Sequence, residues 1–213
     1  IPRVGAAHDG GAAEGYASAS HIRLLLRQGS GDAASAFLPP AAAAVLRREL
    51  AAGRVTDSRH VERAILARLR QMEEREFAAY DGGGEGLYHR VYDAVRRCAT
   101  VEELLAAVKT KRYTAARLRR MVLSAWLGLP KVPETLPYAR VLAANETGRS
   151  LLRQMRKAGA PVLTKAADVA ALGSGAEALF RREAGYTDLY TLAYADLAQA
   201  VPGNDWRLTP VMK

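Results

Sequence analysis

The sequence predicts a mainly α-helical protein, a multi-helix domain that contains one small β-α-β unit. Apolar residues recur at helical spacing along most of the chain, as they do within residues 61–69, and this period is typical of amphipathic helices. Beyond Pro133 the period changes, because short apolar runs at 139–144 and 161–164 flank a further helical pattern. Two such runs around one helix indicate strands joined by a crossover helix.

The expected helices follow one another along the chain, and most carry a cap or a stop residue. Residues 1–17 predict the end of an extended segment and then a Gly-rich loop. Ser18 or Ser20 can cap the first helix, and Thr114 can cap the helix that ends before Gly128. In order, the expected helices span residues 20–29, 40–50, 59–69, 72–80, 85–98, 101–108, 115–127, 146–158, 176–182 and 187–201.

Composition sets the broad class of the protein. Hydrophobic residues make up 49% of the 213 residues, which is enough for a real core. No run of 18 apolar residues occurs, so we expect no membrane-spanning helix. The single Cys98 excludes a disulfide framework and favours a reduced, cytoplasmic setting. The chain begins at Ile1 without an initiator Met or a signal-peptide pattern, so we expect a fragment or a processed chain.

The positive charge of the chain is concentrated in one block. The net charge is +9, and residues 87–156 hold 14 Lys and Arg against 5 Asp and Glu, whereas the remainder holds 17 of each. A local excess of this kind is the electrostatic footprint of a polyanionic partner. No helix combines a basic face with large exposed aromatic residues, as a membrane-surface helix would. The charge pattern therefore favours a nucleic acid over a membrane.

The densest positive charge lies in residues 109–120, called the basic segment below. Six of its twelve residues are basic and none is acidic. Three cations precede the expected start of a helix, where each is unfavourable by about 0.3–1 kcal/mol because that end is already partially positive. A bound phosphate would offset this cost, and the tyrosine could stack on a base. A solvated basic face is the alternative. The candidate nucleic-acid-binding residues here are Lys109, Lys111, Arg112, Tyr113, Arg117 and Arg120.

A second basic surface is expected on the helix over residues 146–158. Its cations Arg149, Arg153, Arg156 and Lys157 form one stripe, opposite the apolar residues of the same helix. We count Arg149 and Arg153 among the candidate nucleic-acid-binding residues.

The sequence contains few motifs typical of small-molecule, metal or catalytic sites. Ser18, Ser20 and Arg23 stand at one helix start and could hold a phosphate, although a structural cap is the more ordinary interpretation of such serines. The four histidines show no metal-ligand spacing with each other or with Cys98, so we expect no metal site. The sequence has no P-loop, no GxSxG motif and no Gly-rich dinucleotide turn after a strand.

Several groups of residues, spread over nearly the whole chain, resemble the motifs of one family. Arg3-Val4-Gly5 with His8-Asp9 resembles its R-I-G…H-D segment, and residues 18–23 resemble S-A-[ST]-x-I-R. Residues 85–90 resemble E-G-L…R, and residues 109–117 resemble K-T-K-R-Y-T-x-x-R. The last two blocks are matched by Arg140-Val141-Leu142 with Asn145 and Gly148-Arg149, and by Asp188-Leu189-Tyr190. Because of these motifs, the sequence resembles the C-terminal half of the bacterial tRNA(Met) cytidine acetate ligases, which are HIGH-type nucleotidyltransferase-like enzymes.

The resemblance implies a two-step reaction. Acetate is activated with ATP to acetyl-adenylate, and the acetyl group then passes to N4 of the wobble cytidine of elongator tRNA(Met). By analogy Arg3 and the backbone of Val4 would contact ATP, with magnesium as its counter-ion. Ser18, Ser20 and Arg23 would hold the ATP phosphates, and the basic residues would hold tRNA. Developing charge on phosphates is stabilised by Arg and helix N–H groups, so these residue types suit the first step.

The resemblance also implies that part of the enzyme is absent from this sequence. The family's H-x-G-H motif and Rossmann-like core lie N-terminal to every motif found here. We therefore expect residues 1–30 to be the end of a nucleotide-binding domain, 31–128 a helical tRNA-binding region, and 129–213 a small α/β part with C-terminal helices. The chain alone is expected to be inactive, and no catalytic residue is assigned to it. A stand-alone helical RNA-binding module and a nucleotidyltransferase of other specificity are the alternatives.

Overall fold

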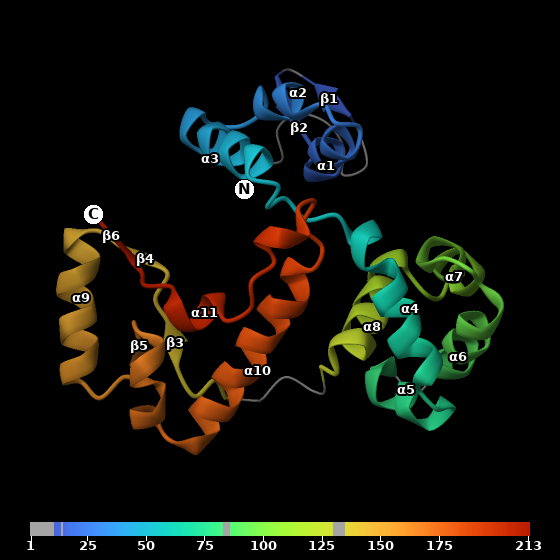
Figure 1. Cartoon of the computed structure of the whole chain (residues 1–213). Coiled ribbons are helices and arrows are strands. Elements are labelled where there is room, and N and C mark those ends of the chain that lie inside the picture. The colour runs from blue at the N-terminus through green and yellow to red at the C-terminus, as the bar shows by residue number, and fades with distance from the viewer. Residues whose placement is uncertain (1–10, 14, 83–85, 130–134) are drawn as a thin grey trace. The chain divides into compact units, whose positions relative to one another are not determined.

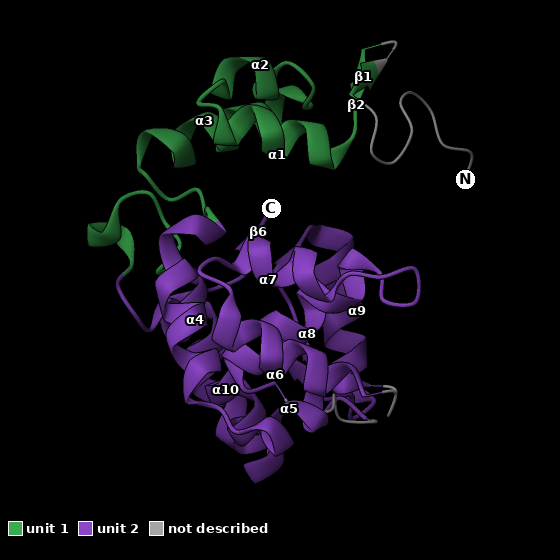
Figure 2. Ribbon diagram, turned by 90° about the vertical axis from the view of Figure 1, so that its right-hand side faces the viewer, with its two compact units in different colours: residues 1–57, 191–200 green, residues 58–190, 201–213 purple. Residues whose placement is uncertain are grey.

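The computed structural model describes residues 11–13, 15–82, 86–129 and 135–213 and is mainly helical, as expected (Figure 1). The chain forms two compact units, residues 1–57 with 191–200 and residues 58–190 with 201–213 (Figure 2). These boundaries differ from the expected ones at residues 30 and 128. None of the described helices is long and apolar enough to cross a membrane.

The first unit contains a short hairpin and three helices. The hairpin pairs β1 with β2 in antiparallel orientation, and it was not expected from the sequence. Gly53 joins this part to the returning segment 191–200, since the Asp196 backbone N–H donates to the Gly53 carbonyl at 3.0 Å. Gly53 has φ +66° and a Cβ there would lie 2.5 Å from the Asp196 Cβ, so only glycine fits. The elements are β1 (Ala12–Ala13), β2 (Tyr16–Ala17), α1 (Ala19–Arg27), α2 (Gly31–Ser35), α3 (Pro40–Ala51) and the 3₁₀ turn η3 (Leu197–Gln199).

An ion-pair group closes the C-terminal end of α3. Glu49 accepts hydrogen bonds from Arg54 at 2.7 Å and from Arg48 at 2.8 Å. These two guanidinium groups, Arg54 foremost, lower the pKa of Glu49 to about 2. The turn after α3 is therefore held by Glu49 in its charged form at neutral pH.

Residues 58–129 form a helical bundle around one apolar core. The inward residues expected for residues 61–69 and 85–98 are buried, which confirms the helical faces assigned to them. The core is built on large side chains that are less than 2% exposed, among them Leu69, Phe77 and Leu118. The elements are the 3₁₀ turn η1 (Ser58–Val61), α4 (Glu62–Gln71), α5 (Glu74–Asp81), α6 (Leu87–Arg97), α7 (Val101–Val108) and α8 (Ala115–Leu127).

Residues 135–213 contain the β-α-β unit. Strand β3 pairs in parallel with β5, and α9 connects them, which confirms the expected unit. The expected strand over residues 139–144 is divided in two, because its second part, β4, pairs in parallel with β6 near residue 212 instead. The elements are β3 (Ala139–Arg140), β4 (Ala143–Ala144), α9 (Glu146–Lys157), β5 (Val162–Leu163), the 3₁₀ turn η2 (Ala166–Leu172), α10 (Ser174–Thr191), α11 (Asn204–Arg207) and β6 (Val211–Met212).

The end of the chain differs from the expected pair of helices. One long helix, α10, covers residues 174–191, and residues 192–201 form turns. Gly185 lies inside α10, where glycine costs about 1 kcal/mol relative to alanine. Packing outweighs that cost, because Phe180 and Ala184 of the same helix are 1% and 2% exposed in the core of this part. The hydroxyl of Tyr138 donates to Glu183 at 2.7 Å, and burial and this bond raise the pKa of Tyr138.

Candidate nucleic-acid interface

The helix start expected to hold a phosphate is present at α1. Ser18 caps α1, and its Oγ accepts from the His21 backbone N–H at 3.1 Å. Ser18 is 7% exposed, whereas Ser20 and Arg23 are exposed. The first turn carries no acidic residue, and a helix start of this kind favours an anion. Arg3 and Val4 lie outside the described residues.

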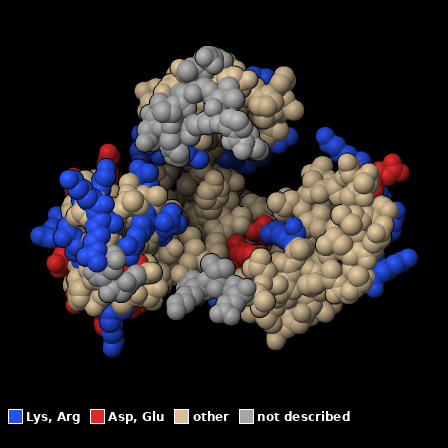
Figure 3. Space-filling view, turned by 180° about the vertical axis from the view of Figure 1, so that it is seen from behind, with Lys and Arg blue, Asp and Glu red and all other residues tan. Residues whose placement is uncertain are grey.

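The basic segment starts at the end of α7 and runs into the first half of α8. Lys109 ends α7, and Thr114 caps α8 with its hydroxyl accepting from the Arg117 backbone N–H at 3.3 Å. Gly128 ends α8 in the left-handed conformation, which confirms the expected helix and both of its ends. On the outside of this region the exposed cations are Lys109, Lys111, Arg112, Arg119 and Arg120. Figure 3 shows Lys and Arg gathered densely over the bundle.

Arg117 points into the protein and has a structural role. Its Nη2 donates to the Asp81 Oδ1 at 3.1 Å and to the Asp81 backbone carbonyl at 3.0 Å. The Asp81 side chain is 2% exposed and that of Arg117 26%. The guanidinium also lies 5.4 Å from the ring centre of Tyr113. The expectation that Arg117 is available to RNA is therefore not supported, because its donors are engaged by a buried carboxylate.

Tyr113 is likewise part of the bundle. It is 5% exposed, and its backbone N–H donates to the Thr110 hydroxyl at 3.2 Å. A buried ring presents no face to a base, so the expected exposed stacking surface is wrong. Asp81 is the residue that sequence reasoning missed here. Its position at the end of a charged helix carried no sign of burial.

The second basic surface lies on α9 as expected. Arg149, Arg153, Arg156 and Lys157 are all exposed, and Arg156 donates to the Thr164 hydroxyl at 2.5 Å. Lys165 follows strand β5 at its carboxyl end and lines a cavity together with three of these arginines. Sequence reasoning passed over Lys165, although polar residues that follow parallel strands are good candidates for binding sites.

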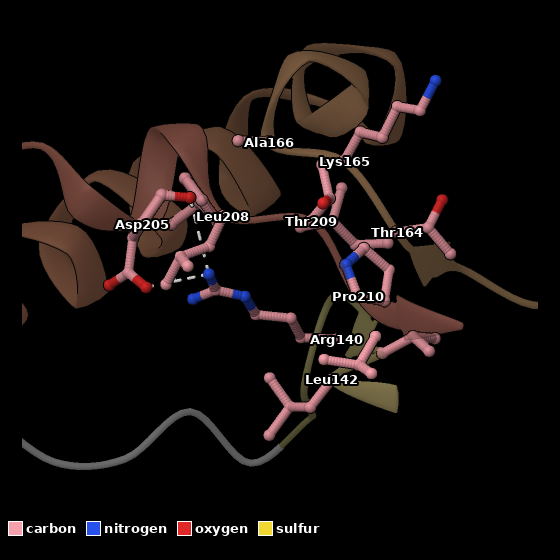
Figure 4. Close-up of a pocket in the computed structure, with 13 residues that line it drawn as sticks. Arg140, Leu142, Thr164, Lys165, Ala166, Asp205, Leu208, Thr209 and Pro210 are labelled. Atoms are coloured by element: carbon pink, nitrogen blue, oxygen red, sulfur yellow. Dashed lines mark hydrogen bonds and ion pairs between the residues drawn. The ribbon is translucent and has the colours of Figure 1, made fainter. Parts of the chain in front are cut away.

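A network around Asp205 holds this part together. Asp205 is 6% exposed and accepts from Arg140 Nη2 at 2.8 Å and from the Thr187 hydroxyl. Figure 4 shows Arg140 reaching Asp205 across a cavity of about 240 Å³. The Arg140–Asp205 ion pair joins β3 to α11, and the Thr187 hydroxyl of α10 bonds to the same carboxylate. Arg140 is therefore engaged within the protein. Among the described residues no group of three or more His, Cys, Asp or Glu could hold a metal ion.

A family model described as HIGH Nucleotidyl Transferase matches residues 1–204. The chain belongs to the HIGH nucleotidyl transferase family. Two curated relatives carry the name tRNA(Met) cytidine acetate ligase. That of Kosmotoga olearia is 36% identical over 159 residues, which cover 70% of this chain and 37% of that protein. That of Syntrophomonas wolfei is 26% identical over 227 residues, which cover 99% of this chain and 54% of that protein. The chain thus spans about half the length of such relatives, or less.

Solved structures of this family share the fold. The crystal structure of Thermotoga maritima TmcAL in apo form I matches with a TM-score of 0.89 and 25% identity, over 100% of this chain and 54% of that one. The form II structure of the same protein, bound with alpha-thio ATP, matches with a TM-score of 0.85 and 23% identity, over 94% of this chain and 53% of that one. The family model and the relatives confirm the resemblance to HIGH-type nucleotidyltransferases and to proteins named tRNA(Met) cytidine acetate ligase.

Proposed function

We propose that this chain is part of an ATP-dependent tRNA(Met) cytidine acetate ligase and corresponds to its C-terminal half. The whole enzyme would activate acetate as acetyl-adenylate and form N4-acetylcytidine at the wobble position of elongator tRNA(Met) in the cytoplasm. The observation that carries the proposal is the match to ligases of that name, which extends over 99% of this chain in the Syntrophomonas wolfei protein. The H-x-G-H motif and the Rossmann-like core would belong to a segment not included in this sequence.

The start of α1 fits the phosphates of ATP. Its first turn contains no acidic residue, and Ser20 and Arg23 are exposed there. A hydroxyl, a guanidinium and the N–H groups of a helix start are donors that stabilise phosphate charge. Ser18 would act mainly through the helix, because it caps α1 and is only 7% exposed. We assign no residue to magnesium, which would be held by the phosphates themselves. Arg3 and Val4 remain the proposed contacts to the rest of ATP.

The basic segment and α9 would supply the tRNA contacts. We propose Lys109, Lys111, Arg112 and Arg120 as phosphate contacts, because their side chains are exposed on the bundle. Arg149 and Arg153 would add contacts from α9. Contacts to the phosphate backbone position an RNA and make its affinity depend on salt.

Replacing Lys109 and Lys111 by Ala is expected to weaken tRNA(Met) binding and to flatten its salt dependence. Each lost phosphate contact lowers the slope of log affinity against log salt by about 0.7–0.9. Filter binding at several salt concentrations measures this directly. The matched control is Arg47→Ala/Arg182→Ala, which removes two exposed cations elsewhere and should leave the slope unchanged. Equal slopes in the wild type and in both variants would contradict the assignment.

The 213-residue chain alone is expected not to acetylate tRNA. The chain carries the proposed phosphate and tRNA contacts but no H-x-G-H motif, so acetyl-adenylate should not form. The measurement is transfer of labelled acetate to tRNA(Met) in the presence of ATP, with a full-length ligase of the family as positive control. Formation of N4-acetylcytidine by this chain would show that the missing motif is dispensable.

A further inference from the structure

A second cavity opens between α9, the residues after β5 and the segment that leads into β6. It measures about 410 Å³. Its far wall is set by the pairing of β6 with β4, in which the Val211 N–H donates to the Leu142 carbonyl at 3.0 Å. Thr164, Thr209 and Pro210, which line this cavity, are labelled in Figure 4. The cavity is thus built by the parallel strand pair and belongs to the fold.

Four cations and no carboxylate line this cavity: Arg149, Arg153, Arg156 and Lys165. The three arginines recur at i, i+4 and i+7, so they share one face of α9. Within the described part of the chain, Arg149, Arg153 and Lys165 form no ion pair. Like charges in one concave site repel one another, and a bound anion removes that repulsion. The charges therefore indicate a phosphate, which arginine recognises with paired donors.

The cavity also has an apolar part, which a bare phosphate would not require. Its apolar lining residues are Leu152 of α9, Pro210, and Met212 of β6. A flat ring fits against such a wall, since thioethers and aliphatic groups contact aromatic faces favourably. Arginine planes can stack on the same ring. Phosphate donors beside an apolar wall are the chemistry that holds one nucleotide.

We infer that this cavity takes one unstacked nucleotide of a single-stranded RNA segment, with its phosphate on the arginines of α9 and its base against Leu152, Pro210 and Met212. A base inside a duplex is stacked on both faces and cannot enter such a cavity, whereas loop nucleotides can be splayed out. The inference rests on the proposed RNA-binding function and deepens it, because it adds a base contact to contacts that are otherwise electrostatic.

The first test compares an unstructured oligoribonucleotide with an RNA duplex of equal length, by fluorescence anisotropy on the 213-residue chain. Arg149→Ala/Arg153→Ala/Arg156→Ala should weaken binding of the single strand at least about tenfold more than binding of the duplex, because only the single strand can seat a nucleotide in the cavity on these arginines. The control Arg47→Ala/Arg63→Ala/Arg182→Ala removes three exposed cations that do not line the cavity. It should change both affinities equally and by less than about threefold.

The second test observes the base directly. In protein with ¹³C-labelled Met methyl groups, the single strand should shift the Met212 resonance through the ring current of the base. Met72 and Met121 are 1% and 3% exposed in the bundle and serve as unshifted references, and Met212→Leu assigns the signal. A bound single strand that leaves Met212 unshifted overturns the nucleotide cavity but not tRNA binding. Absence of any RNA binding overturns both proposals. If free AMP shifts the Met212 resonance as much as the single strand does, the cavity binds a free nucleotide. That result would overturn the assignment to single-stranded RNA.

Discussion

Arg117→Ala is expected to destabilise the helical bundle by about 3–5 kcal/mol, because it leaves a buried carboxylate without its partner. The Asp81 side chain is 2% exposed, and Arg117 donates to both its Oδ1 and its backbone carbonyl. Asp81 Oδ2 accepts a long bond of 3.4 Å from the Tyr88 N–H. Urea unfolding followed by circular dichroism measures the loss.

The control for this change is Arg119→Ala, which removes an exposed cation from the same helix. A surface substitution of that kind should stay within about 0.5 kcal/mol. The double variant with Asp81→Ala should lose less stability than the sum of the two single variants, since the partners are in contact. An Arg117→Ala protein as stable as the wild type that has lost tRNA binding would instead make Arg117 an RNA contact.

Phe180→Ala is expected to cost about 3–5 kcal/mol in the part formed by residues 135–190 and 201–213. Phe180 is 1% exposed, and its ring centre lies 4.8 Å from that of Trp206 and 5.1 Å from the Arg140 guanidinium carbon. The ring therefore packs α10 against both β3 and α11. Its loss leaves a cavity at the point where these three elements meet.

Trp206 reports this loss, because its ring contacts Phe180 edge-to-face. In a Trp126→Phe background its fluorescence should follow unfolding of this part alone. The control Leu151→Ala removes an apolar side chain that is 55% exposed on α9, so it should change stability little. If the free energy of unfolding of the Phe180→Ala protein equals that of the wild type, Asp205 and its partners hold β3, α10 and α11 together without the Phe180 ring.

The sequence predicted those features that depend on neighbouring residues. Thr114, Gly128 and Ser18 are caps or stops in the structure as expected, because a cap bonds within three or four positions of itself. The parallel pair of β3 and β5 was predicted for a similar reason, since the strands and their crossover helix form one continuous stretch.

The features that the sequence did not predict depend on distant partners. The helical pattern placed Arg117 on the polar face of α8, and only the packing of α5 against α8 brings Asp81 to it. Tyr113 is buried for the same reason. Two helices were expected over residues 176–182 and 187–201, yet burial of Phe180 and Ala184 keeps α10 continuous across Gly185. The proposed RNA contacts on the outside of the bundle stay predictions.

The pairing of β4 with β6 sets an order of completion during protein synthesis. The bundle over residues 58–129 can fold once its own helices have left the ribosome, whereas Ala143–Ala144 must wait for Val211–Met212. At about 5–20 residues per second, the intervening stretch takes several seconds to translate. Throughout that delay the wall that contains Pro210 and Met212 is absent, so the arginines of α9 do not yet line a cavity. A nascent chain therefore gains its bundle first and its α9 cavity only once the residues of β6 have been made.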